Sequence, residues 1–161
     1  MFQYRDATDA DFPVIASFPQ DKDEAFYMYP KSTYPLTADQ LRSVAADRSC
    51  LTVITDSDSV IGYGNLYEVN EGEDCWIGNV IVRPSSRGSG AAGYLIQTLI
   101  NRASEEHRVR TVRLICHNTN TNALLFYSGL GFKPYDVRLQ EGPRKLAGIR
   151  MSIPVEGQVT L

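Results

Sequence analysis

Apolar residues recur at helical spacing in the middle of the chain, directly after a glycine-rich segment. They follow the i, i+3, i+4, i+7 pattern of an amphipathic helix, at Ala92, Leu95, Ile96, Leu99, Ile100 and Ala103. The opposite face is polar and carries Gln97, Asn101, Arg102 and Glu105. This pattern predicts a helix that begins near residue 92 and buries one side against other elements.

Runs rich in β-branched and aromatic residues predict strands on both sides of this helix. The expected strands are residues 2–5, 50–55, 60–68, 73–82, 112–117, 132–139 and 146–153. Strands first, then strands alternating with helices, indicate an α/β chain. We expect one mixed sheet of six to seven strands with helices on both faces.

Three further helices are expected from capping residues and periodicity. They are residues 9–17 with Asp9 as a candidate N-cap, residues 37–47 with a Thr37/Gln40 capping box, and residues 121–129, which glycines end. Residues 26–35, between the first two of these helices, are rich in aromatic residues and contain two prolines. This composition predicts an irregular loop.

Size and composition describe an ordinary globular chain. Its 161 residues, 43% hydrophobic and 22% charged, predict a single domain over residues 1–161. No run approaches the roughly 20 apolar residues of a membrane span, and no secretion signal is visible. The three cysteines, Cys50, Cys75 and Cys116, form no C-x-x-C pair and are expected to be reduced thiols of a cytoplasmic protein. A net charge of −3 argues against broad nucleic-acid binding.

A predicted strand ends at Val82, and a glycine-rich turn then opens the amphipathic helix. Such a junction presents unpaired backbone N–H groups and the positive end of the helix dipole to one point. Gly88, Gly90 and Gly93 allow a ligand to approach without a Cβ in the way. The segment is therefore a candidate phosphate-binding site.

Residues 88–93 also match G-x-G-x-x-G, the fingerprint of nicotinamide dinucleotide-binding oxidoreductases. That motif requires a tight turn directly after a strand and an acidic residue roughly 20 positions later. Here residues 83–87 intervene, and the next strand ends in Cys116-His117. We therefore rank the dinucleotide interpretation second.

The pattern Arg87-x-x-Gly90-x-Ala92 resembles the pyrophosphate loop of the GNAT N-acetyltransferase superfamily. Residues 120–132 resemble its second signature, N-x-x-A-x-x-x-Y-x-x-x-G-F, and residues 4–8 with Asp11 resemble its opening strand and turn. The resemblance spans most of the chain in the expected order. It implies a mostly antiparallel GNAT-like sheet and acetyl-CoA as the acetyl donor.

The resemblance also implies roles for individual residues. The diphosphate of CoA would lie on Arg87, Gly88, Ser89, Gly90, Ala91, Ala92 and Gly93. The backbone of Val80 and Val82 would pair with the pantetheine arm and face the thioester oxygen. Asn120 would hydrogen-bond CoA, although it is also a candidate N-cap, as are Asn118 and Asn122. Tyr127 would protonate the leaving thiolate, since a phenol is protonated at neutral pH.

The general base is the least defined part of this prediction. Some relatives carry a glutamate on the strand before the loop, but residues 75–79 contain no carboxylate. We expect an ordered water to remove the proton, polarised by Glu73 or by backbone carbonyls. This gap keeps open a non-catalytic acyl-CoA-binding module. His107 and His117 have no metal-ligand spacing, so no metal is expected.

The aromatic segment lies where this family covers its acceptor. Its residues Phe26, Tyr27, Tyr29 and Tyr34 are candidates for holding an alkyl amine by packing and cation–π contact, or for packing alone. The segment resembles bacterial GNATs that acetylate lysine at peptide C-termini, which implies a small-molecule or peptide amine of lysine-like chemistry. The sequence leaves a monomer or a homodimer open, with residues 140–145 as a dimer edge or a substrate lid.

Overall fold

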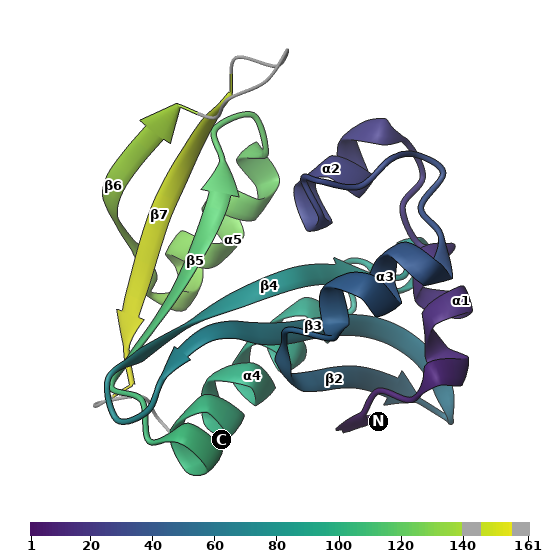
Figure 1. The fold of residues 1–161 in the computed structure, drawn as a ribbon, viewed down its shortest axis with the longest axis horizontal. Helices are drawn as coiled ribbons and strands as arrows, with labels where there is room; N and C mark the ends of the chain where they lie inside the picture. The colour runs from purple at the N-terminus through teal and green to yellow at the C-terminus, as the bar shows by residue number, and fades with distance from the viewer. Residues whose placement is uncertain (140–145, 156–161) are drawn as a thin grey trace.

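A computed structural model describes residues 1–139 and 146–155 (Figure 1). The strands are β1 (Phe2–Asp6), β2 (Ser49–Asp56), β3 (Ser59–Asn70), β4 (Asp74–Val82), β5 (Thr111–His117), β6 (Lys133–Leu139) and β7 (Ala147–Pro154). The helices are α1 (Phe12–Ala16), α2 (Lys22–Met28), α3 (Ala38–Ala45), α4 (Ala91–His107) and α5 (Thr121–Leu130), with short 3-10 turns η1 (Asp9–Asp11) and η2 (Pro84–Ser86). Residues 140–145, a candidate dimer edge or lid, lie outside the described residues.

The strands form one seven-stranded sheet in the order β1-β2-β3-β4-β5-β7-β6. Neighbours are antiparallel except β4 and β5, which run parallel. These two pair only at their first residues, Asp74–Trp76 against Thr111–Arg113. Beyond that point they diverge toward their C-terminal ends (Figure 1). The mixed, mostly antiparallel sheet with helices on both faces confirms the predicted fold class.

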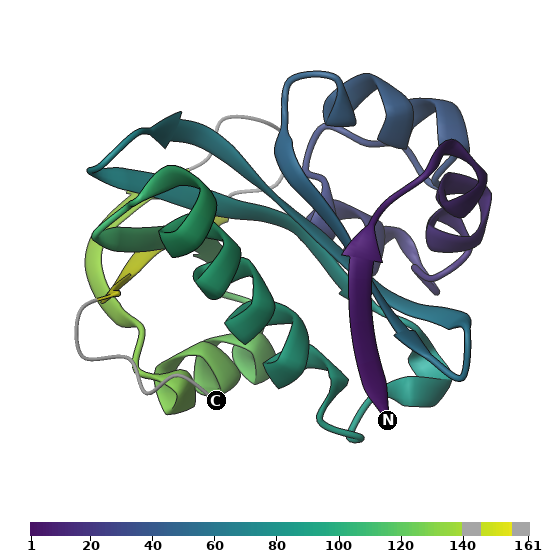
Figure 2. The same cartoon turned by 90° about the horizontal axis from the view of Figure 1, so that it is seen from below.

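Helices cover both faces of the sheet (Figure 2). Each face has its own core of buried side chains. Because successive side chains on a strand point to opposite faces, Ile54 belongs to the core under α4, whereas its neighbour Val53 packs with α1 and α3. On α4, Leu95, Ile96 and Leu99 are fully buried, as the helical pattern predicted. This burial fixes the start of α4, where the glycine-rich turn lies.

The first helix begins differently from the sequence expectation. Thr8, not Asp9, is the N-cap of the 3-10 turn η1 that leads into α1, and its backbone N–H donates to Asp11 Oδ2 at 2.6 Å. Arg5 also donates two hydrogen bonds to the Asp11 carboxylate and lowers its pKa. Asp11 is therefore buried and bonded, and Asp9 forms an exposed ion pair with Arg42.

The expectation of an irregular loop from Phe26 is wrong at its start, because α2 continues to Met28. Asp21 caps this helix by accepting a hydrogen bond from the backbone N–H of Glu24 at 2.9 Å. Ala25 and Met28 form its buried side. Of the helices in the described part of the chain, none has the length and hydrophobicity needed to cross a membrane.

Candidate active site

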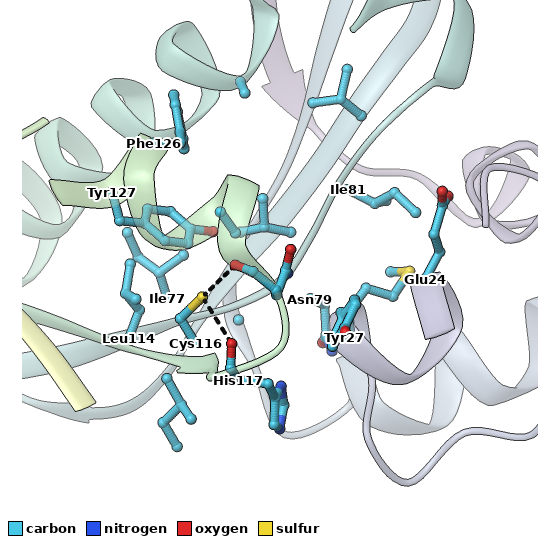
Figure 3. Close-up of a pocket in the computed structure, with 18 of the residues that line it drawn as sticks. Glu24, Tyr27, Ile77, Asn79, Ile81, Leu114, Cys116, His117, Phe126 and Tyr127 are labelled. Atoms are coloured by element: carbon cyan, nitrogen blue, oxygen red, sulfur yellow. Dashed lines mark hydrogen bonds between the residues drawn. The ribbon is translucent and has the colours of Figure 1, made fainter. Parts of the chain in front are cut away.

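A cavity of about 500 Å³ opens where β4 and β5 diverge (Figure 3). Its walls come from the C-terminal halves of these strands, the start of α4, one side of α5 and the end of α2. Six residues that the sequence assigned to CoA binding or catalysis line it: Val80, Val82, Arg87, Ala92, Asn120 and Tyr127. Tertiary structure thus brings together two motifs that are separated along the chain.

The β4 wall of the cavity contains a bulge. Tyr63 pairs with Ile81 and Asn65 pairs with Gly78, so two steps along β3 face three steps along β4. Asn79 takes up the difference with a left-handed backbone, φ +53°. A bulge bends a strand and frees backbone groups from the ladder. This bulge lies in the part of β4 that lines the cavity, where Val80 and Val82 were predicted to pair with the pantetheine arm.

The glycine-rich turn caps α4, and of its residues Arg87 and Ala92 line the cavity, whereas residues 88–91 and Gly93 do not. Gly90 is the N-cap residue with φ +90°, and Gly88 has φ +78°. A Cβ on Gly88 would meet no atom within 4 Å, so open space lies beside the turn. The start of α4 carries unpaired N–H groups at its positive end. This turn fits a diphosphate, with glycine at the two positions that need a left-handed backbone.

The Arg87 side chain, at the start of the glycine-rich turn, contacts α2. Its Nη1 and Nη2 donate to the Glu24 carboxylate at 2.9 and 2.8 Å, and its Nε donates to the Val82 carbonyl at 3.1 Å. The Arg87 guanidinium lowers the pKa of Glu24. Glu24 lines the cavity but is ionised and already bonded.

Tyr127 projects from α5 with its hydroxyl directed into the cavity (Figure 3). Burial raises the pKa of its phenol, and the nearby Cys116 thiol raises it further. Burial also raises the pKa of Cys116 to about 12. Both groups are therefore protonated at neutral pH, and both line the cavity.

Asn120 stands at the N-cap position of α5 but makes no side-chain capping bond. Its backbone carbonyl accepts from Leu124 N–H at 3.0 Å, and the residue lines the cavity. The rival cap Asn118 instead accepts a hydrogen bond from the Ala147 N–H at 3.0 Å.

Glu73 lies away from the cavity, in the turn before the paired end of β4. Its backbone carbonyl accepts hydrogen bonds from the N–H groups of Arg110 and Thr111 at 2.8 and 3.1 Å. It is not among the residues that line the cavity. This placement corrects the expectation that Glu73 polarises a catalytic water there.

Of the four aromatic candidates, only Tyr27 lines the cavity. Its hydroxyl shares a hydrogen bond with Thr119 Oγ1 at 2.7 Å, which links α2 to the loop after β5. Phe26 packs beside it on the His117 ring, with centroids 4.7 Å apart. Tyr29 packs into the core under α1 and α3, and Tyr34 is exposed and donates to the Gln20 carbonyl.

Sequence reasoning missed a chain of buried polar side chains behind the β4 bulge. Arg48 Nη1 donates to Asn65 Oδ1 at 3.1 Å, and Asn65 Nδ2 donates to Asn79 Oδ1 at 2.9 Å. Asn79 Nδ2 in turn donates to the carbonyl of Met28 at 2.8 Å. The available signal was the occurrence of asparagine within otherwise apolar strands.

Arg48 reaches the cavity from the segment between α3 and β2. Its guanidinium lies 4.0 Å from the Tyr67 ring centroid. Gly78 provides the space, since a Cβ there would lie 2.2 Å from Arg48 Nη1. Burial lowers the pKa of Arg48, but a guanidinium remains charged. No carboxylate of the described residues forms an ion pair with it.

Known structures share this architecture. The spermidine N-acetyltransferase of Vibrio cholerae, solved with CoA and spermine, aligns with a TM-score of 0.79 at 19% identity, covering 95% of each chain. The ribosomal-protein-S18-alanine N-acetyltransferase of Escherichia coli aligns with a TM-score of 0.73 at 18% identity, covering 99% of this chain and 100% of that chain. An N-acetyltransferase from Staphylococcus aureus Mu50 aligns with a TM-score of 0.75 at 18% identity, covering 97% of this chain and 99% of that chain.

These identities establish the fold alone, and no curated protein matches the chain significantly by sequence. A family model described as Acetyltransferase (GNAT) family matches residues 14–132, which is more than half of the chain. That range includes both motifs and all of the residues that line the cavity. The chain therefore belongs to the GNAT family of acetyl-CoA-dependent N-acetyltransferases.

Proposed function

We propose that the protein transfers the acetyl group of acetyl-CoA to a primary amine by direct attack, without an acyl-enzyme intermediate. The observation that carries this proposal is the cavity between the diverging strands, with a bulged backbone on one wall and the Tyr127 phenol on the other. The donor thioester would lie between these walls. The buried thiol Cys116 supports direct transfer, because its raised pKa makes it a poor nucleophile.

Each wall has a separate task in this mechanism. Backbone N–H groups near Val80 would stabilise the negative charge that develops on the thioester oxygen. As the C–S bond breaks, the Tyr127 hydroxyl would donate its proton to the leaving sulfur. The glycine-rich turn would anchor the diphosphate and thereby fix the thioester relative to both walls.

The attacking amine must lose a proton, because an alkyl ammonium group has an ordinary pKa near 10. Glu24 is the carboxylate that lines the cavity, and it is engaged by Arg87. We therefore propose removal through an ordered water held by backbone carbonyls of the bulged strand. The amine would enter between α2 and the open end of β4, past Tyr27.

We further propose that the acceptor is a lysine-like amine that also carries a carboxylate. Arg48 supports this substrate class, because it is a charged guanidinium at the cavity with no carboxylate partner among the described residues. A substrate carboxylate would supply that partner and a charge-assisted hydrogen bond. Polyamines such as the spermine bound to the Vibrio cholerae structure lack such a group.

Replacing Arg48 with Gln is expected to lower kcat/KM for a lysine-terminated peptide by about 10- to 100-fold, the effect of losing a hydrogen bond to a charged group. The test compares the free-acid peptide with the same peptide amidated at its C-terminus. The amidated peptide should be a poor substrate for wild type and should lose much less than the free-acid peptide in the variant. An equal loss for both peptides would contradict carboxylate recognition.

A panel of amines tests the reaction itself. Wild-type protein is incubated with acetyl-CoA and free lysine, lysine-terminated peptides or spermidine, and acetylated products are identified by mass spectrometry. Acetylation of lysine-type amines is expected. Binding of acetyl-CoA with no product from any amine would favour the acyl-CoA-binding module instead.

A further inference from the structure

Asn79 is the extra residue of the β4 bulge, and its side chain is 5% exposed although it borders the cavity. Its left-handed backbone is one that asparagine adopts more readily than most residues other than glycine. The conformation alone would be satisfied by glycine. Backbone conformation therefore does not explain why a buried amide side chain occupies this position.

The amide of Asn79 is bonded at both ends. Its oxygen accepts from Asn65 Nδ2 at 2.9 Å, and its nitrogen donates to the backbone carbonyl of Met28 at 2.8 Å. Asn65 is itself fully buried and anchored by donating to the Tyr63 hydroxyl at 3.0 Å and accepting from Arg48. This series of hydrogen bonds therefore begins in the sheet and ends at α2.

Met28 is the last residue of α2, where helix carbonyls lack partners within the helix. The Asn79 amide satisfies one of these carbonyls in a buried setting. Two further polar contacts of α2, Glu24 with Arg87 and Tyr27 with Thr119, lie nearer the surface. A buried hydrogen bond is costly to break, because water does not replace the lost partner.

We infer that Asn79 is a positioning residue for acetyl transfer, whose amide locks the end of α2 to the bulge of β4. This lock fixes the acceptor entrance at Tyr27 and Met28 relative to the backbone that faces the thioester. Asn79 acts through Met28 and Asn65 rather than by touching the reacting atoms. The kinetic consequence rests on the proposed function, but the lock itself does not.

Two substitutions separate the amide from the backbone. Asn79→Gly keeps the left-handed conformation and removes both hydrogen bonds. Asn79→Asp keeps the oxygen that faces Asn65 but cannot donate to the Met28 carbonyl at neutral pH. The matched control is Asn70→Gly, which removes an amide that donates to Asp74 Oδ1 at 2.7 Å at the opposite end of β4.

Hydrogen exchange read by mass spectrometry tests the lock without any assay of activity. Both Asn79 variants should exchange the amides of peptides covering Lys22–Met28 about tenfold faster than wild type, the effect of one lost buried hydrogen bond. Peptides of α4 should be unchanged, and the Asn70 variant should leave α2 unchanged. Wild-type exchange in α2, or equal acceleration in α2 and α4, would overturn the inference.

Kinetics supply the second readout. In both Asn79 variants the KM for the amine should rise about tenfold, while the dissociation constant of acetyl-CoA changes by less than about twofold. A loss confined to acetyl-CoA binding would overturn the positioning role. If wild type acetylates no amine, the proposed function fails, and the exchange experiment still decides whether Asn79 locks α2.

Discussion

Replacing Tyr127 with Phe is expected to lower kcat by about 100- to 1,000-fold, the usual contribution of a general acid. The change removes one oxygen atom and keeps the ring, which packs against Phe126 and Phe132. The fold and acetyl-CoA binding should therefore survive. Steady-state kinetics and calorimetric titration with acetyl-CoA measure the two effects separately.

The pH profile provides the control for this substitution. Because burial and Cys116 raise the pKa of Tyr127, its hydroxyl stays protonated above the ordinary tyrosine pKa near 10. Wild-type kcat should therefore show no loss from phenol ionisation up to about pH 10. Equal kcat values for wild type and the Phe variant would remove Tyr127 from the mechanism.

Replacing Gly90 with Asp is expected to weaken acetyl-CoA binding by at least about 100-fold. The carboxylate of the new Asp, within about 4 Å of the diphosphate, would be repelled by several kcal/mol at the effective dielectric constant of a protein surface. Gly90 also has φ +90°, where a side chain strains the backbone. Calorimetric titration measures the dissociation constant.

Gly72→Asp is the matched control for this variant. Gly72 has φ +77°, and a Cβ at this position would meet no atom within 4 Å. It lies in the turn between β3 and β4, at the end of β4 away from the bulge. The control carries the same new charge and a similar backbone strain, so it should lose thermal stability to a similar extent and bind acetyl-CoA like wild type. Comparable binding losses in both variants would indicate a general effect of charge or unfolding.

The sequence predicted the parts of the fold that depend on regular patterns. The periodicity from Ala92 to Ala103 located α4, and alternating apolar runs located the strands, because burial of one side imposes these repeats. The two motifs predicted the meeting of the glycine-rich turn with Tyr127. That prediction came from resemblance, since nothing in the spacing of residues 90 and 127 places them at one cavity.

The remaining features depend on contacts that a linear pattern does not encode. The helix α2 is only seven residues long and lies among aromatic residues and prolines, so its period is too short to detect. The lock between Asn79 and Met28 joins residues 51 positions apart, and Arg87 meets Glu24 across 63 positions. Asparagine in a strand signals a bulge or a buried bond but does not name its partner.

The most direct test of acetyl transfer to an amine is the stoichiometry of product formation by wild-type protein. Acetyl-CoA and a lysine-terminated peptide are mixed with the protein, and released CoA and acetylated peptide are quantified together. We expect equal amounts of both products, formed only when the peptide is present. CoA release without acetylated peptide, or acetyl-CoA binding without release of CoA, would contradict acetyl transfer to a lysine-type amine.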